Sequence, residues 1–131
     1  MALKDKQKVT KNQHLWQSMW HALCGLGTAV KLERNMRWHV LAAVLVIVLG
    51  WWLGLTLNQW LWIGLAIFLV IQSEVFNTVI EQVVDLLTAH HYVLAAKYAK
   101  DMAAAAVLLA ALFAFCVGLL IFIPKILGLL P

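Results

Sequence analysis

Three long apolar runs restrict the folds open to this chain more than any other feature of its sequence. They cover approximately residues 38–55, 57–87 and 99–123, and even the shortest is just long enough to cross about 30 Å of hydrocarbon as an α-helix. With 64% hydrophobic and 12% charged residues, the chain lacks the polar surface that a soluble domain of this length needs. The sequence therefore predicts an all-α integral membrane protein with three transmembrane helices.

The segment before the first apolar run differs in character. Residues 1–13 form a basic tail, and residues 14–32 carry apolar side chains at three- and four-residue steps, namely Leu15, Met19, Leu23, Leu26 and Val30. This spacing predicts an amphipathic helix that lies in the membrane interface. The membrane domain then covers residues 14–131. No cleavable targeting segment is expected, because the first apolar run begins late and lacks a small-residue cleavage pattern.

Short sequence motifs mark the ends of the apolar runs. Only residues 54–58 separate the first two runs, which predicts a tight hairpin between their helices. Pro124 follows the third run and is expected to mark the end of its helix. The two cysteines, Cys24 and Cys116, lie in separate apolar contexts without metal-ligand spacing and are interpreted as packing residues.

The basic residues predict the orientation in the membrane. With a cytoplasmic N-terminus, nine of the ten Lys and Arg residues face the cytoplasm and only Lys125 lies outside. The nine are Lys4, Lys6, Lys8, Lys11, Lys31, Arg34, Arg37, Lys97 and Lys100. Such a bias is typical of inward-facing loops. The net charge of +4 therefore indicates membrane orientation and attraction to anionic headgroups, and no nucleic-acid partner is expected.

Acidic residues gather on one face of the second predicted span. Glu74, Asn77, Glu81 and Asp85 are three, four and four residues apart, which places them within an arc of roughly 80° on the helix. Counting the helical rise from Trp60 at the outer boundary places Glu74 about 9 Å inside the apolar layer. Ionisable groups at such positions usually have a function.

Three further charged residues fall in the same inner-leaflet zone. Glu33 ends the predicted interfacial helix, and Lys100 and Asp101 begin the third span. Two adjacent histidines, His90 and His91, occupy the loop before it. Neighbouring histidines in a short loop rarely share one metal ion, so no zinc site is expected. His14, His21 and His39 are interpreted as interfacial polar residues.

A cluster of this kind suits phosphoryl transfer. Mg²⁺ is usually held by one or two carboxylates together with phosphate oxygens, and a lysine beside them can neutralise phosphate charge. A poorly hydrated carboxylate suits a general base for a lipid hydroxyl. The sequence has neither a GxxxxGK[ST] motif nor a kinase-type glycine loop. Alternatively, the acids could pair with Lys97 or Lys100 to hold the helices together, and Asn77 could form an interhelical hydrogen bond.

These residues resemble the signature of the prokaryotic diacylglycerol kinase family. The pattern consists of E-x-x-N-x-x-x-E-x-x-x-D over residues 74–85 and A-K-D over residues 99–101, and the similarity covers about residues 14–126. Residues 31–39 look like the Gram-positive branch, whose characterised activity is undecaprenol kinase. The resemblance implies an ATP-dependent lipid kinase with Mg²⁺ as cofactor. It also implies a homotrimer in the bacterial cell membrane, with active sites at the cytoplasmic face shared between neighbouring chains.

The resemblance also implies roles for individual residues. By position, Glu74 matches the proton acceptor, and Glu33 and Glu81 match the metal-binding glutamates. The nucleotide-contacting pair corresponds to Lys100 and Asp101. The remaining matches are two polar residues of the site and a nucleotide-contacting histidine, namely Asn77, Asp85 and His91. His90 departs from the family, where an acidic residue and a tyrosine are often found, and His21 is a loose candidate for an N-terminal contact with ATP.

The predicted function is phosphorylation of the hydroxyl of undecaprenol, with diacylglycerol as the alternative substrate. Residues 33–37 and 123–125 favour undecaprenol through their likeness to the Gram-positive branch. A proton or cation transporter is a competing class, because intramembrane acids also form relays. The outer half of the bundle has no ionisable path, however, and neither proline nor paired glycines break a span. A structural scaffold would leave five clustered acids unexplained.

Overall fold

The computed structural model describes residues 15–128, which form four α-helices in chain order. They are α1 (Leu15–Leu32), α2 (Arg34–Trp52), α3 (Leu57–Thr88) and α4 (Leu94–Leu127). The last three are long and apolar enough to cross a membrane. The predicted all-α membrane fold with three spans is therefore confirmed, whereas the predicted basic tail, residues 1–13, lies outside the described residues.

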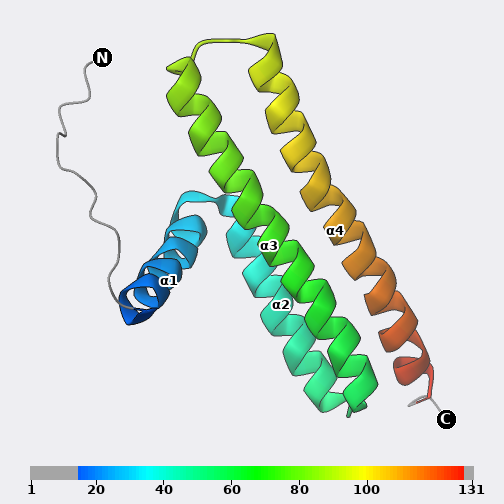
Figure 1. Cartoon of the computed structure of the whole chain (residues 1–131). Helices are drawn as coiled ribbons and strands as arrows, with labels where there is room; N and C mark the ends of the chain where they lie inside the picture. The colour runs from blue at the N-terminus through cyan, green and yellow to red at the C-terminus, as the bar shows by residue number, and fades with distance from the viewer. Residues whose placement is uncertain (1–14, 129–131) are drawn as a thin grey trace.

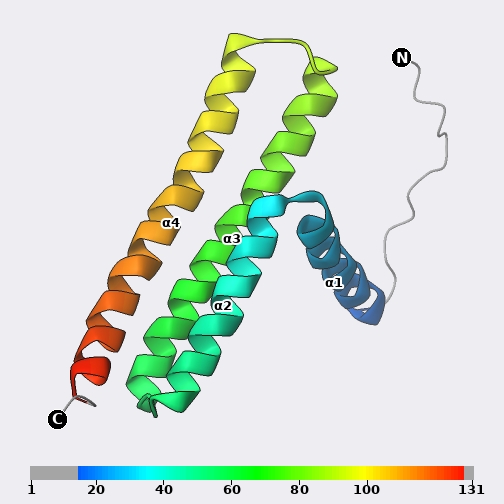
Figure 2. The ribbon, with the colours of Figure 1, turned by 180° about the vertical axis from the view of Figure 1, so that it is seen from behind.

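The three spanning helices differ in length, and this difference positions the site. In both views α3 and α4 run antiparallel, and α2 accompanies α3 along only part of its length (Figures 1 and 2). With 32 residues in α3 and 19 in α2, the helical rise gives lengths of about 48 Å and about 28 Å. The ends of α3 and α4 that carry their connecting loop therefore continue beyond the start of α2. The helix α1 leads away from the bundle at the turn between α1 and α2.

The hairpin between α2 and α3 is defined by local chemistry. Gly54 has a φ of 61°, a left-handed conformation that glycine adopts without steric penalty. Thr56 then begins α3 with a capping box, because its hydroxyl accepts from the Gln59 amide and its own amide donates to Gln59 Oε1. From the far end of α4, Lys125 Nζ donates to the Gly54 carbonyl at 2.9 Å. All three spans are thus joined at this end of the bundle.

Replacing Gly54 by alanine should destabilise the protein by about 1–2 kcal/mol, because a Cβ at this left-handed position clashes with the backbone. Thermal unfolding in detergent micelles measures the effect. Gly64→Ala is the matched control, since an added Cβ there meets no atom within 4 Å and alanine favours a helix by about 0.5–1 kcal/mol. Equal unfolding temperatures for the two variants would contradict the role of the turn.

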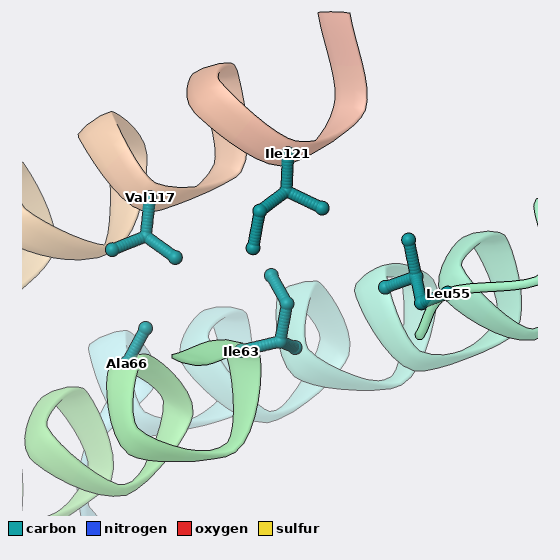
Figure 3. Packing of buried hydrophobic residues seen from close by; sticks show 5 residues of the cluster. All are labelled: Leu55, Ile63, Ala66, Val117 and Ile121. Carbon is teal, nitrogen blue, oxygen red and sulfur yellow. The ribbon is translucent and has the colours of Figure 1, made fainter. Parts of the chain in front are cut away.

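A small apolar core joins α3 and α4 in the half of the bundle near the hairpin. Val117 and Ile121 of α4 face Ile63 and Ala66 of α3, with Leu55 at the hairpin end of the cluster (Figure 3). Most other large apolar side chains are exposed on this single chain, as in Trp51 with 82% of its surface accessible. Such a surface suits lipid or other transmembrane helices as neighbours, not water.

Two sequence expectations about helix ends differ from the structure. Pro124 does not end α4, which continues to Leu127. The proline removes a single backbone donor and its φ is compatible with a helix, and the Gly128 amide still donates to the Pro124 carbonyl at 3.0 Å. Helix α4 also starts earlier than the third apolar run, at Leu94 and not near residue 99. The extra residues form the part of α4 that continues past the start of α2.

Candidate active site

The acidic face of α3 enters the interior of the chain at its midpoint. Glu74 and Asn77 are 1% and 6% exposed, while Glu81 and Asp85 lie further along the same face. Asn77 Nδ2 donates to Glu81 Oε1 at 2.9 Å, which fixes the amide one turn from that carboxylate. This bond of Asn77 Nδ2 lies within α3 and does not connect two helices. This face presents one buried carboxylate followed by progressively more accessible polar groups.

Two buried oxygens on this face have no hydrogen-bond partner within residues 15–128. They are Glu74 Oε1 and Asn77 Oδ1. Nearly all buried polar atoms in proteins have a partner, because an unpaired one loses its hydration without compensation. Both atoms accept hydrogen bonds, so a group that binds here and pairs with them has to be a hydrogen-bond donor. A hydroxyl group meets that requirement.

Glu33 approaches this face from the turn between α1 and α2. It lies between the two helices with an extended backbone, φ −101° and ψ 123°, and its side chain makes no capping bond. Glu33 and Glu81 are the charged groups that act electrostatically on Glu74. Across the described part of the chain, no basic side chain forms a salt bridge with any of these three acids. Within residues 15–128 these carboxyl groups therefore have no cationic partner.

This acidic group fits one part of a Mg²⁺ site. No set of three or more metal-ligating side chains occurs among the described residues. Mg²⁺ does not require one, since it commonly binds one or two carboxylates and completes its shell with water and phosphate oxygens. Glu33 and Glu81 provide two carboxylates near an unneutralised acid, which is the donor chemistry that the ion prefers.

A second group of charged side chains surrounds the loop between α3 and α4. Lys100 Nζ donates to Asp85 Oδ1 at 2.5 Å and so links α4 to α3. Lys97 pairs with Asp101 one turn apart on α4. These four residues, with His90 and His91, line a pocket of about 530 Å³. Two lysines and two histidines facing one cavity can bind a polyphosphate.

The loop brings its histidines to this pocket through an unusual backbone. Ala89 and His90 both have positive φ angles, 48° and 61°, so the chain reverses directly after α3. His90 Nδ1 lies 3.9 Å from Asp85 Oδ2. Lys97 and Tyr92 also line the pocket, although the sequence interpretation assigned neither to the site. The three-residue step from Lys97 to Lys100 was the signal that could have identified the second lysine.

The structure divides the predicted site residues into two groups along the bundle. Glu74 and Asp85 are separated by eleven residues of α3, a rise of about 16 Å. Since Lys100 pairs with Asp85, the lysine lies at that far end and not beside Glu74. Glu33 and Glu81 act on Glu74, whereas Asp101 and His91 line the pocket with Lys100. A single chain thus holds the buried acid and the basic pocket apart.

Comparison with known proteins identifies the family to which these features belong. Residues 20–122 match the profile of the prokaryotic diacylglycerol kinases. The chain belongs to the prokaryotic diacylglycerol kinase family. It is 40% identical to the undecaprenol kinase of Bacillus subtilis over 124 residues, which cover 95% of this chain and all of that relative. The resemblance seen in the sequence is confirmed, including its Gram-positive branch.

Two diacylglycerol kinases are also similar. The Synechocystis enzyme is 36% identical over 136 residues, covering 98% of this chain and 78% of the relative. The Haemophilus influenzae enzyme is 32% identical over 103 residues, covering 79% of this chain and 86% of the relative. A member of this kinase family transfers phosphate from ATP to a lipid alcohol, so the protein is a lipid kinase located in a membrane.

Proposed function

We propose that this kinase phosphorylates the hydroxyl of undecaprenol and that Glu74 is its general base. The observation that carries the proposal is the buried Glu74 Oε1, which has no hydrogen-bond donor within residues 15–128. The hydroxyl of a lipid alcohol donates a hydrogen bond to Glu74 Oε1, and this bond orients the hydroxyl. The choice of undecaprenol rests on the 40% identity to the Bacillus subtilis enzyme across nearly the whole chain. Diacylglycerol is the second candidate because two further relatives carry that name.

Each residue of the site has a role that follows from its position. Glu74 accepts the proton of the lipid hydroxyl as its oxygen attacks the γ-phosphate, and its burial keeps water from competing as acceptor. Lys100 offsets the charge of the transferring phosphate, with Asp101, Asp85 and His91 contacting the nucleotide. Asn77 holds the side chain of Glu81 through its hydrogen bond. Glu33 and Glu81 are the residues that would hold Mg²⁺, and the ion would supply charge neutralisation for the phosphate groups of ATP.

The working enzyme is proposed to be a homotrimer with active sites shared between chains. The division of the site supports this, because Glu74 and Lys100 of one chain lie at opposite ends of the acidic face, about 16 Å apart along the helix. A neighbouring chain that contributes its own Lys100 and Asp101 would bring the basic pocket to the buried acid. The extensive exposed apolar surface of the single chain also suits helix packing between copies.

The proposed location is the bacterial cell membrane, with the N-terminus and the active site on the cytoplasmic side. Of the described basic residues, Lys31, Arg34, Arg37, Lys97 and Lys100 lie toward the α3–α4 loop end of the spans, whereas Lys125 lies at the hairpin end. Because basic residues concentrate on the cytoplasmic side, the α3–α4 loop faces the cytoplasm. ATP then reaches the pocket beside that loop directly.

Transfer of labelled phosphate from ATP tests the proposed substrate. Purified protein in lipid vesicles is given undecaprenol or diacylglycerol in parallel, and kcat/KM is expected to be at least about tenfold higher for undecaprenol, within the range that apolar pockets achieve. Chelation of Mg²⁺ should abolish transfer to both. A preference for diacylglycerol would refute the substrate assignment. Proton flux across the vesicles without ATP would instead support a transporter.

A further inference from the structure

An apolar groove of about 210 Å³ lies between α2, α3 and α4. Its floor is a buried stripe of α3 that includes Ile63, Ala66 and Val70, and small residues of α4 form one wall, namely Ala111, Ala114 and Gly118. The second wall is α2. Small side chains leave room beside the helix backbones, and no polar group other than His39 lines the groove.

The groove leads to the buried acid. Val70 precedes Glu74 by four residues, so the two lie on the same face of α3. The alignment of α4 along α3 leads to the same conclusion. Moving eleven residues from the Lys100–Asp85 pair along each antiparallel helix reaches Ala111 on α4 and Glu74 on α3. The inner end of the groove is therefore level with the carboxylate whose Oε1 has no donor within residues 15–128.

The groove runs from the level of Glu74 toward the hairpin end of the bundle. From Ala111 to Phe122, which lines its other end, the helical rise is about 16 Å. With Glu74 about 9 Å inside the apolar layer, the groove reaches past the midplane of the roughly 30 Å hydrocarbon layer. A lipid alcohol whose hydroxyl donates to Glu74 extends its chain away from the cytoplasmic side, which is the direction in which the groove runs.

We propose that this groove binds the hydrocarbon chain of a single-chain lipid alcohol and places its hydroxyl at Glu74. This inference rests on the proposed function and deepens it. The groove lies between three helices, and its volume of about 210 Å³ has room for one hydrocarbon chain, so the second chain of a diacylglycerol would remain outside. The small residues of its α4 wall act as the specificity determinant, since a larger side chain there would displace the distal part of the substrate chain.

Gly118→Leu is the variant that tests the groove. Gly118 lies seven residues from Ala111, about 10 Å from the inner end of the groove, and a Cβ added there meets only Phe122 at 4.0 Å. The helix accommodates the substitution, while the leucine side chain fills the distal half. With the full-length protein, KM for undecaprenol should rise at least about tenfold, corresponding to about 1.4 kcal/mol. Geraniol reaches only the half of the groove nearest Glu74, so KM for its phosphorylation should change by less than about twofold.

Gly64→Leu is the matched control. Gly64 follows groove residue Ile63 directly but is exposed on α3, with nothing within 4 Å of an added Cβ. It should leave KM for both alcohols unchanged, and a rise equal to that of Gly118→Leu would overturn the proposal.

An unchanged undecaprenol KM in Gly118→Leu, or an equal loss with both alcohols, would also overturn it. So would a change in oligomer size by light scattering, because the groove would then be a contact between copies. If the wild-type protein phosphorylates neither alcohol, the proposed function fails and not the groove alone.

Discussion

Glu74→Gln should lower kcat for lipid phosphorylation by about 10²–10⁴-fold, the contribution of a well-placed general base. The amide has nearly the same shape as the carboxylate but cannot accept the hydroxyl proton. Since Glu74 is 1% exposed and forms no side-chain hydrogen bond within the described residues, the substitution breaks no hydrogen bond there. Initial rates of labelled phosphate transfer at saturating ATP and undecaprenol measure the effect.

Two controls separate chemistry from assembly in this variant. Oligomer size in detergent should match the wild type, and the affinity for ATP should be retained, because the basic pocket lies at the other end of the acidic face. Gln72→Glu, two residues earlier in α3 and lining a cavity between α3 and α4, should not restore activity in the Glu74→Gln background. Near-normal turnover of Glu74→Gln would refute the proposed base.

Lys100→Met is the second substitution with a large expected effect. It removes the ammonium group that is proposed to offset the phosphate charge, and kcat should fall by about 10²–10³-fold, as when one stabilising donor is removed from a transition state. Methionine retains most of the apolar stem. The same substitution also leaves Asp85 without the partner that its carboxylate has at 2.5 Å, so the α3–α4 connection is weakened as well.

Lys97→Met provides the comparison for that variant. Lys97 lies one turn earlier on α4, lines the same pocket and also pairs with an aspartate, but its pair is exposed and lies within one helix. Exposed pairs of this kind contribute only a few tenths of a kcal/mol, and kcat should remain within about threefold of the wild type. Equal losses in the two lysine variants would show that total pocket charge, not the position of Lys100, determines catalysis.

The sequence predicted the membrane fold because its signals are local. Apolar runs of sufficient length specify spanning helices, and the three- and four-residue spacing of Glu74, Asn77 and Glu81 placed them on one face without tertiary information. The capping box at Thr56 and the glycine at position 54 likewise act within a few residues of themselves. The family was recognisable for the same reason, since its motifs lie in two short stretches of chain.

Features that depend on how helices pack could not be predicted in this way. The sequence allowed the acids to pair with either Lys97 or Lys100. Lys97 pairs with Asp101 one turn away in α4, whereas the pairing of Lys100 with Asp85 depends on the rotation and register of α4 against α3. The separation of Glu74 from the basic pocket has the same origin. The end of α4 was misjudged because the effect of Pro124 was read from its residue type, whereas a proline near a helix end removes one bond and leaves the next turn free to form.

The hydrogen bond from Lys125 to the Gly54 carbonyl has a consequence for motion. It joins the end of α4 to the hairpin of α2 and α3, next to the apolar core, so local opening is most difficult there. At the other end, α3 and α4 continue past α2 and are linked by a half-buried ion pair and a short loop. Movement of the chain is therefore expected to be greatest in the loop-proximal parts of α3 and α4, around the pocket lined by Lys97 and Lys100, while the hairpin end stays fixed.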